Sequence, residues 1–280
     1  MPHILLLTLE GSLSLFLAVL KNVYGIFWVF VLAFVAERFL PIEDSISGRS
    51  MRLNYIVGFF ALLFEQLGLV SISYFLVRPM PSLSSVFTIS DSSSFGKAFA
   101  VGFCWFVTRD FFYYWFHRLQ HASKWLWAEH ALHHSEEQVN VTTSIRHHWL
   151  DKVLELFFIL IPLQLIFRPP FLALATVGGI LGMVGFSNHM NFKFGLGRLN
   201  WLITTPQSHR IHHSRLPEHL DKNFAAFFPL WDMIFGTYHA PAKDEYPPTG
   251  LSSGERVTTT RQALLLPFTM WRKMISGNAK

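Results

Sequence analysis

Three histidine motifs constrain this chain more than any other feature of its sequence. They read His117-Arg-Leu-Gln-His121, His130-Ala-Leu-His133-His134 and His209-Arg-Ile-His212-His213. With 14 His in 280 residues, chance predicts roughly 0.03 copies of an H-x-x-H-H pattern per chain, so two copies argue against accident. On a helix, residues at i, i+3 and i+4 share a face, so each motif presents its ring nitrogens in one direction. The fold is therefore expected to bring three such faces together.

Converging imidazoles indicate a metal centre. Eight ring nitrogens exceed the four ligands of a tetrahedral zinc ion, but they fit two ions with roughly four imidazoles each. Imidazole binds iron, zinc, copper and nickel alike, so the ligand type alone does not identify the metal.

The composition indicates a membrane protein. The chain is 51% hydrophobic and 16% aromatic, and 15% of its residues are charged, whereas a soluble domain has about 25% charged residues. Residues 23–39, 55–77 and 95–116 are each about as long as a bilayer core of about 30 Å requires. Residues 1–20 lack a basic n-region, so we expect a membrane-associated helix there and not a cleaved signal peptide.

The basic residues fit a membrane protein better than a nucleic-acid-binding one. They carry a net charge of +5, but they are scattered through loops, as expected for a protein that faces anionic lipid. Because many of them accompany the histidine motifs, we expect the motifs to face the cytoplasm, at a bacterial inner membrane or the endoplasmic reticulum. The single Cys104 excludes an intramolecular disulfide and a cysteine-based metal site.

Two short apolar runs separate the second and third motifs. Residues 153–167 and 171–187 reach only roughly 22 to 26 Å as helices, and Pro169-Pro170 between them breaks the helix. A re-entrant hairpin fits this pattern. Such a hairpin leaves after His148 and returns His189 to the same side, which delivers the third motif to the first two.

The predicted fold is an all-α integral membrane protein. It has several transmembrane helices and a re-entrant hairpin, capped on the cytoplasmic side by a helical, histidine-rich di-metal site. We expect one continuous membrane domain. In it, residues 1–100 hold the N-terminal transmembrane helices, residues 101–240 the histidine-motif catalytic region, and residues 241–280 a C-terminal tail.

An ordered set of motifs between about residues 109 and 238 resembles a known superfamily. The motifs are Asp110-Phe-Phe-Tyr-Tyr-Trp-Phe-His117-Arg118, Trp127-Ala-Glu-His130, His133-His134-Ser135, Thr204-Thr-Pro206, His209-Arg-Ile-His212-His213-Ser214, Asn223-Phe and Trp231-Asp232-Met-Ile-Phe-Gly236-Thr237-Tyr238. Together they resemble the fatty acid hydroxylase and sterol desaturase superfamily, whose members are membrane non-haem di-iron oxygenases that act on lipids.

The resemblance implies a ligand set and a reaction. The superfamily's ligands fall on His117, His121, His130, His133, His134, His209, His212 and His213, and His189 resembles an additional ligand. These residues would hold two iron ions, which zinc can replace on purification. The implied enzyme is an oxidoreductase, a monooxygenase that hydroxylates a C–H bond of a sterol, fatty acyl or alkyl lipid with dioxygen as co-substrate.

The electrons for this reaction are expected from outside the chain. Gly195-Leu-Gly197 lacks the third glycine and the strand–helix context of a dinucleotide site. A cytochrome, a ferredoxin or a reductase is the expected donor, with a pterin as the alternative. A desaturase with the same di-iron site is the alternative reaction, and a non-catalytic metal-binding membrane protein or metal transporter is a weaker alternative.

Two further residues are predicted to orient ligand histidines. Asp110 shares a helical face with His117 and His121, so we expect its carboxylate to accept a hydrogen bond from a histidine of the 209–213 motif. The alternative for Asp110 is an ion pair with Arg109 or another basic residue. His148 is assigned either to the same role or to loop packing.

The other histidines, and two departures from the superfamily pattern, are expected to lie away from the metals. His3, His147, His219 and His239 are predicted to be interfacial or surface residues. The departures are Asn223-Phe224-Ala225 and His148-Trp149-Leu150-Asp151. We expect them to affect the lipid pocket and to leave the metal site untouched.

Overall fold

The chain folds into helices joined by long loops. The computed structural model describes residues 24, 27–39, 41–42, 46–72, 95–167 and 183–277. Within these ranges the sole β interaction is an isolated antiparallel bridge between Ser214 and Thr249. The prediction of an all-α fold is therefore confirmed for the described part of the chain.

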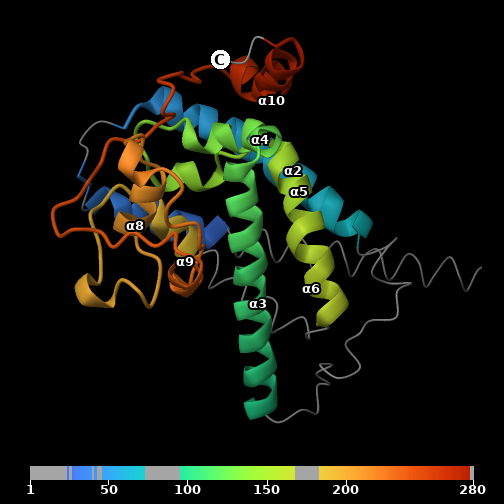
Figure 1. Ribbon diagram of the computed structural model, residues 1–280, viewed down its shortest axis with the longest axis vertical. Helices are drawn as coiled ribbons and strands as arrows, with labels where there is room; N and C mark the ends of the chain where they lie inside the picture. Colours follow the sequence, from blue (N-terminus) through green and yellow to red (C-terminus); the bar gives the residue numbers. More distant parts are fainter. Residues whose placement is uncertain are drawn as a thin grey trace, which may run out of the picture.

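The helices that carry the three histidine motifs or pack around them are α2 (Gly48–Ile72), α3 (Phe95–Ala122), α4 (Lys124–His134), α8 (Pro206–His212) and α10 (Thr260–Ile275). Shorter elements connect them, and these are η3 (Val141–Ile145), α5 (Trp149–Glu155), η4 (Leu156–Leu160), α6 (Ile161–Ile166), η5 (Gly197–Leu199), η6 (Pro217–His219) and α9 (Leu230–Ile234). Figure 1 shows α3 extending away from the body of the molecule, with its C-terminal end beneath α4.

A single residue turns the chain between the first two histidine motifs. Ser123 is extended, with φ −106° and ψ 115°, and it separates α3 from α4. The first motif lies in the last turns of α3 and the second at the end of α4. The short connection keeps the two helix ends together, which brings the two motifs face to face.

The first arm of the predicted hairpin is one interrupted helix. α5 continues into α6 through η4, a π-helical turn of five residues. Pro162 follows this turn and cannot donate a backbone hydrogen bond to the preceding turn, which accounts for the locally widened helix. η4 and α6 pack against α3, as Figure 1 shows.

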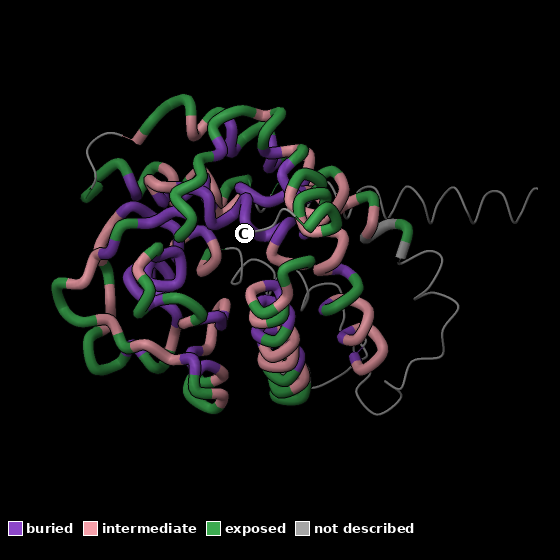
Figure 2. The backbone as a smooth tube through the Cα atoms, turned by 45° about the horizontal axis from the view of Figure 1, so that its top comes forward, coloured by how far each residue is buried: buried purple, intermediate pink, exposed green. Residues whose placement is uncertain are grey.

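The C-terminal segment packs into a hydrophobic core together with α2 and α4. The residues of this core come from α2, α4, α10 and the loop before α10, and they are Leu53, Val57, Ala131, Leu132, Leu251, Val257, Ala263 and Leu266. In Figure 2 the buried parts of the chain gather in the body of the molecule, whereas the end of α3 that points away from it is exposed. The core fixes α4 between α2 and α10.

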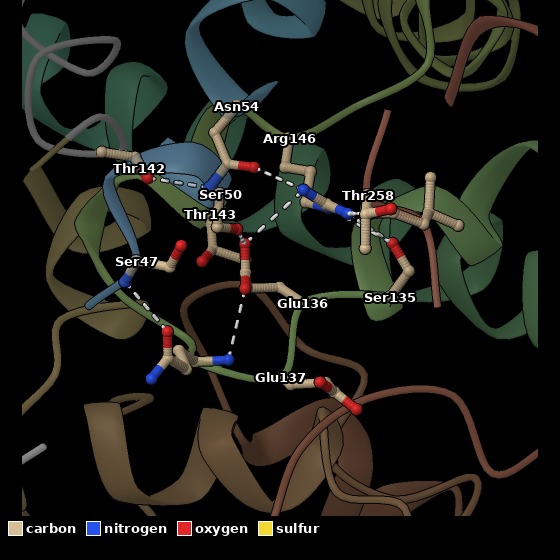
Figure 3. Close-up of polar contacts among 12 residues, drawn as sticks. Ser47, Ser50, Asn54, Ser135, Glu136, Glu137, Thr142, Thr143, Arg146 and Thr258 are labelled. Atoms are coloured by element: carbon tan, nitrogen blue, oxygen red, sulfur yellow. Dashed lines mark hydrogen bonds and ion pairs between the residues drawn. The ribbon is translucent and has the colours of Figure 1, made fainter. Parts of the chain in front are cut away.

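A buried polar network fixes the end of α4 (Figure 3). The Arg146 guanidinium donates to the Leu132 carbonyl at 3.0 Å, to the Ser135 hydroxyl at 2.9 Å and to the Asn54 side chain of α2 at 2.7 Å. Glu136 accepts from Asn54 at 3.1 Å and lies 3.5 Å from Arg146. Because a buried guanidinium is costly to leave unpaired, this network holds the α4 terminus in one position.

None of the helices within the described ranges is both long enough and apolar enough to cross a membrane. α2 contains residues 55–72 of the second predicted stretch and α3 contains all of the third. The predicted N-terminal helix (1–20) and the turn of the hairpin at Pro169-Pro170 lie outside the described residues.

Candidate metal centre

The nine histidines predicted as ligands gather in two groups. One, called here the five-imidazole group, consists of His117, His121, His130, His134 and His212. The other, the four-imidazole group, consists of His133, His189, His209 and His213. Within each group one ring nitrogen per residue lies within 4.8 Å of the others. Eight of the nine side chains are buried, and His121 is partly buried.

The two H-x-x-H-H motifs divide their histidines between the groups. In α4, the i, i+4 pair His130 and His134 belongs to the five-imidazole group and His133 to the four-imidazole group. In the α8 motif the assignment is reversed, because the pair His209 and His213 belongs to the four-imidazole group and His212 to the other. Each motif therefore contributes to both groups.

The residues at the N-terminus of α8 determine where this helix begins. Thr205 is extended and accepts a hydrogen bond from the Ser208 backbone N–H, and Ser208 completes the capping box. Pro206 is in the first turn, where its missing N–H is not needed. This Thr-Pro start begins the helix three residues before His209, so that the motif lies in the second turn and ends at the C-cap residue His213.

The spacing of the ring nitrogens fits metal coordination. Nε2–Nε2 distances are 3.0 Å from His117 to His130 and 3.2 Å from His121 to His134. In the four-imidazole group they are 2.9 Å from His189 to His209 and 3.2 Å from His189 to His133. Nitrogens bound to one ion at about 2.0–2.1 Å are about 3.0 Å apart in octahedral and about 3.4 Å apart in tetrahedral geometry.

A single segment, residues 221–224, orients three members of the five-imidazole group. His117 Nδ1 donates to the Phe224 carbonyl and His212 Nδ1 to the Lys222 carbonyl, both at 2.8 Å. His121 Nδ1 lies 3.4 Å from the Asp221 carboxylate. Because Nδ1 carries the proton, the Nε2 lone pair of each ring points into the group.

The segment 221–224 has a left-handed backbone conformation at two residues, and side-chain hydrogen bonds stabilise it. Asp221 and Asn223 both have φ of 57°, in the left-handed region. The Asn223 amide donates to the carbonyls of Ser208 and His239, both at 3.1 Å, and its oxygen accepts from the His239 N–H at 2.8 Å. Asparagine tolerates this conformation better than most residues, and its side chain ties the segment to α8.

Burial keeps the histidines neutral, as metal ligands must be. Loss of water lowers the pKa of His121 to about 4 and that of His189 to about 3. Burial, followed by repulsion from neighbouring imidazoles, lowers the pKa of other members well below the ordinary value, and these are His117, His133, His134, His209, His212 and His213. The buried Nε2 of His212 has no hydrogen-bond partner within the described part of the chain, so a metal ion would satisfy an otherwise unpaired lone pair.

Two residues that the sequence did not assign to the metals connect the groups. His147 stacks on His133 of the four-imidazole group, with ring centroids 4.2 Å apart and planes 15° apart. Its Nδ1 makes a short hydrogen bond to Asp151, whose carboxylate also lies 3.8 Å from Nδ1 of His130 in the five-imidazole group. The Gln120 amide donates to the other Asp151 oxygen at 2.6 Å. A carboxylate behind ligand imidazoles is a common arrangement that increases their basicity.

This geometry corrects the interpretation of His147 and of the two departures. His147 is buried and is not a surface residue. Asp151 and Phe224 belong to the two segments that depart from the superfamily pattern, and both contact the imidazole groups. The i, i+4 spacing of His147 and Asp151 was the available signal. It points both side chains to one face of the turn that begins α5.

The structure also corrects the role of Asp110. Its carboxylate accepts hydrogen bonds from the backbone N–H groups of Phe227 and Phe228, at 3.0 and 2.9 Å, and not from a histidine. Its predicted alternative partner Arg109 lies 3.5 Å from Glu155. Asp110 therefore fixes the loop that follows Phe224 and acts on the imidazoles only through the backbone. A sequence pattern cannot reveal a partner that is a backbone amide.

His148 is a helix cap. Its Nδ1 accepts from the Leu150 N–H at 3.2 Å at the start of α5, and its Nε2 donates to the Leu264 carbonyl of α10. Of its two predicted roles, packing is therefore the correct one. His219 is buried, not exposed, and lies beside His239. His3 is outside the described residues.

Two buried all-histidine groups in a helical chain define a class of candidate metalloenzymes, and similarity to known proteins indicates a family. The fatty acid hydroxylase family model matches residues 102–237. This region is similar to that family, which confirms the predicted resemblance to the superfamily. No solved structure is significantly similar to the chain.

The relatives are lipid-modifying enzymes. Alkylglycerol monooxygenase of Xenopus tropicalis is 36% identical over 140 residues, which are 50% of this chain and 30% of that protein. The human alkylglycerol monooxygenase is 38% identical over 135 residues, 48% of this chain and 30% of that protein. Ornithine lipid hydroxylase of Rhizobium tropici is 31% identical over 146 residues, 52% of this chain and 44% of that protein.

The similarity covers about half of this chain, and the chain spans less than half the length of these relatives. All three are oxidoreductases by name. The prediction of an oxidoreductase agrees with the activities that the names of these relatives state.

Proposed function

We propose that this chain is a membrane-bound, non-haem di-iron lipid hydroxylase. The observation that supports this most strongly is the division of nine histidines into two buried groups, with facing Nε2 atoms 2.9 to 3.2 Å apart. Each group offers the donors for one ion, so the pair suits two ions. The lipid hydroxylases and monooxygenases among the relatives support a lipid as substrate.

When bound, two iron ions would supply the activation of dioxygen, with electrons from an external donor. The chain positions the ligand imidazoles, sets the charge around them and excludes water from them. The segment 221–224 holds His117 and His212 in one tautomer, and the Asp151 carboxylate lies 3.8 Å from Nδ1 of His130. The ring of Phe224 lies 5.0 Å from that of His121 and 5.6 Å from that of His117, and it excludes water from that side of the five-imidazole group. A dry pocket limits unproductive reaction of a strong oxidant with solvent.

Exposed apolar side chains support contact with a lipid bilayer. On α2, Phe59 and Leu67 are 64% and 56% exposed, and on α3, Phe99 and Phe103 are 66% and 52% exposed. Several large apolar side chains exposed on two helices are typical of a surface that meets a membrane or another protein. We propose that these faces contact lipid, that the metal centre lies on the cytoplasmic side, and that a cytochrome, ferredoxin, reductase or pterin supplies the electrons.

The experiment compares lipids from cells that express the wild type with lipids from cells that express His212→Ala. A hydroxylase gives a lipid one oxygen atom heavier in the wild type only, and the oxygen derives from isotopically labelled dioxygen. A product two hydrogen atoms lighter, without added oxygen, would instead support the desaturase alternative. Identical lipids from both strains, with the wild type expressed and iron-loaded, would contradict the proposed function.

A further inference from the structure

A second cluster of metal-ligating side chains lies outside the two imidazole groups. It consists of His219 at the end of η6, His239 after α9 and Glu245 in the following loop. One ligand atom of each lies within 4.8 Å of the others. His219 Nε2 is 2.9 Å and His239 Nε2 is 3.4 Å from the same oxygen, Oε1 of Glu245.

The His219 ring is held for coordination by a neighbour on its far side. Its Nδ1 forms a hydrogen bond of 3.0 Å with the Ser214 hydroxyl. Without an ion, Nε2 donates to Glu245 Oε1 at 2.9 Å; with the proton on Nδ1 and donated to Ser214, the lone pair of Nε2 becomes available to a metal. An outer hydrogen bond of this kind is typical of histidines that bind metals.

The loop that carries Glu245 is fixed by its own contacts. The second Glu245 oxygen accepts from the Ala242 N–H at 2.8 Å. The Gln207 amide of α8 donates to the Ala242 carbonyl at 2.7 Å and to the Glu245 carbonyl at 3.0 Å. The carboxylate therefore has one oxygen occupied by the backbone and the other directed at the two imidazoles.

One side of the cluster is buried and the other side is open to solvent. The His219 side chain is 4% exposed, whereas the side chains of His239 and Glu245 are 29% and 21% exposed. An ion can therefore enter from solvent and retain water as a fourth ligand. Two imidazoles and one carboxylate with an open position are a donor set that zinc commonly takes.

We infer that His219, His239 and Glu245 form a third metal site, which binds one zinc ion. Zinc takes the place of the hydrogen bonds between the Nε2 atoms and Glu245 Oε1: a neutral ring moves its proton from Nε2 to Nδ1, and a protonated ring releases one proton to solvent, as the zinc–nitrogen and zinc–oxygen bonds form. The site is distinct from the two groups proposed for iron, because it shares no residue with them.

The position of this site gives it a structural role. His239 exchanges backbone hydrogen bonds with the Asn223 side chain, and Asn223 lies in the segment 221–224 that orients three of the five imidazoles. His219, at the end of η6, lies two residues before the same segment in the chain. A zinc ion that joins His219 and His239 would thus hold the segment from both sides.

Zinc titration of the iron-loaded, full-length protein tests this inference. The wild type is expected to bind one zinc equivalent without loss of iron, and Glu245→Gln to bind it at least 100-fold more weakly or not at all. Glu218→Gln is the matched control, because it removes the same charge one residue from His219 at an exposed position. It should bind zinc as the wild type does.

A second variant covers the case in which Glu245→Gln fails to fold. His239→Gln changes the most exposed of the three ligands and should lose the same equivalent, and the visible absorption of bound cobalt should disappear with it. Equal zinc binding by the wild type and both variants would overturn the inference, as would no zinc binding by the wild type. The readout is the difference in bound zinc between the variants. The test is therefore valid whether or not the protein hydroxylates lipids.

Discussion

His133 and His134 are neighbours in the sequence, but their imidazoles belong to different groups. His133 Nε2 lies 3.2 Å from Nε2 of His189, whereas His134 Nε2 lies 3.2 Å from Nε2 of His121. Successive residues on a helix point about 100° apart, so α4 separates the two groups. A pair of adjacent histidines therefore holds two metal positions at a fixed distance from each other.

This relationship predicts unequal effects of substituting the two neighbours. His133→Ala leaves three imidazoles in its group and should reduce bound iron from about two to about one per chain. His134→Ala leaves four imidazoles in the other group and should retain more iron. Both variants should lose lipid hydroxylation. Iron per chain is measured by elemental analysis after anaerobic purification.

The control for this pair is His148→Ala. It removes a helix cap and should lower the free energy of unfolding by about 1 kcal/mol, with iron content unchanged. Loss of iron from His148→Ala equal to that from His133→Ala would show that our assignment of His148 to packing is wrong.

Asp151→Asn should weaken metal binding without unfolding the protein. The carboxylate bonds to His147 and lies 3.8 Å from His130 Nδ1, and an amide of the same shape lacks its negative charge. We expect iron affinity, measured by competition with a chelator, to fall by roughly 10- to 100-fold. Asp244→Asn, at an exposed carboxylate, serves as the comparison. Unchanged affinity in Asp151→Asn would remove Asp151 from the set of residues that orient ligands.

Asn223 is expected to control the five-imidazole group selectively. Asn223→Gly keeps the left-handed backbone but loses the side-chain bonds to Ser208 and His239, so the segment 221–224 should loosen and iron should leave this group first. Asn223→Ala, which also strains a backbone with φ of 57°, should lose more stability than the glycine variant. Chemical denaturation and iron content separate the two effects. If the glycine variant retained both irons, the segment would not be what orients these imidazoles.

Asp110→Asn should reduce stability more than metal affinity. The native carboxylate accepts two backbone N–H groups, from Phe227 and Phe228, and an amide has one oxygen to offer them. An unpaired buried N–H costs about 1–3 kcal/mol, which denaturant titration can measure. A variant with normal unfolding free energy and much weaker iron binding would instead support direct contact between Asp110 and a ligand histidine.

The metal-free protein should lose stability as the pH falls from 6.5 toward 4. Burial lowers the pKa of folded His121 to about 4 from a model-peptide value of 6.5. Between these values the unfolded chain binds a proton that the folded chain does not, so the free energy of unfolding decreases with decreasing pH. The measurement is denaturant unfolding at several pH values. A His121→Phe variant should show a shallower decrease, and an equally steep one would mean that other groups control it.

The sequence by itself indicated which histidines gather. Histidine spacing at i, i+3 and i+4 depends only on helix geometry, so the eight histidines of the three motifs could be picked out before any tertiary structure was known, and the resemblance to the superfamily added His189. The same local rules fixed the start of α8 at Thr205 and Pro206, because capping acts within a few residues. Helical structure followed from the same short-range periodicity.

Tertiary structure alone decided how these residues are grouped and supported. The division into groups of five and four depends on how α3, α4 and α8 cross, which no local pattern contains. Contacts such as that of Asp110 with backbone amides, or of His117 with the Phe224 carbonyl across 107 positions, join segments whose separation is set by packing. Every residue has a backbone N–H or carbonyl group that looks the same in the sequence, so such partners become visible only when the chain is folded.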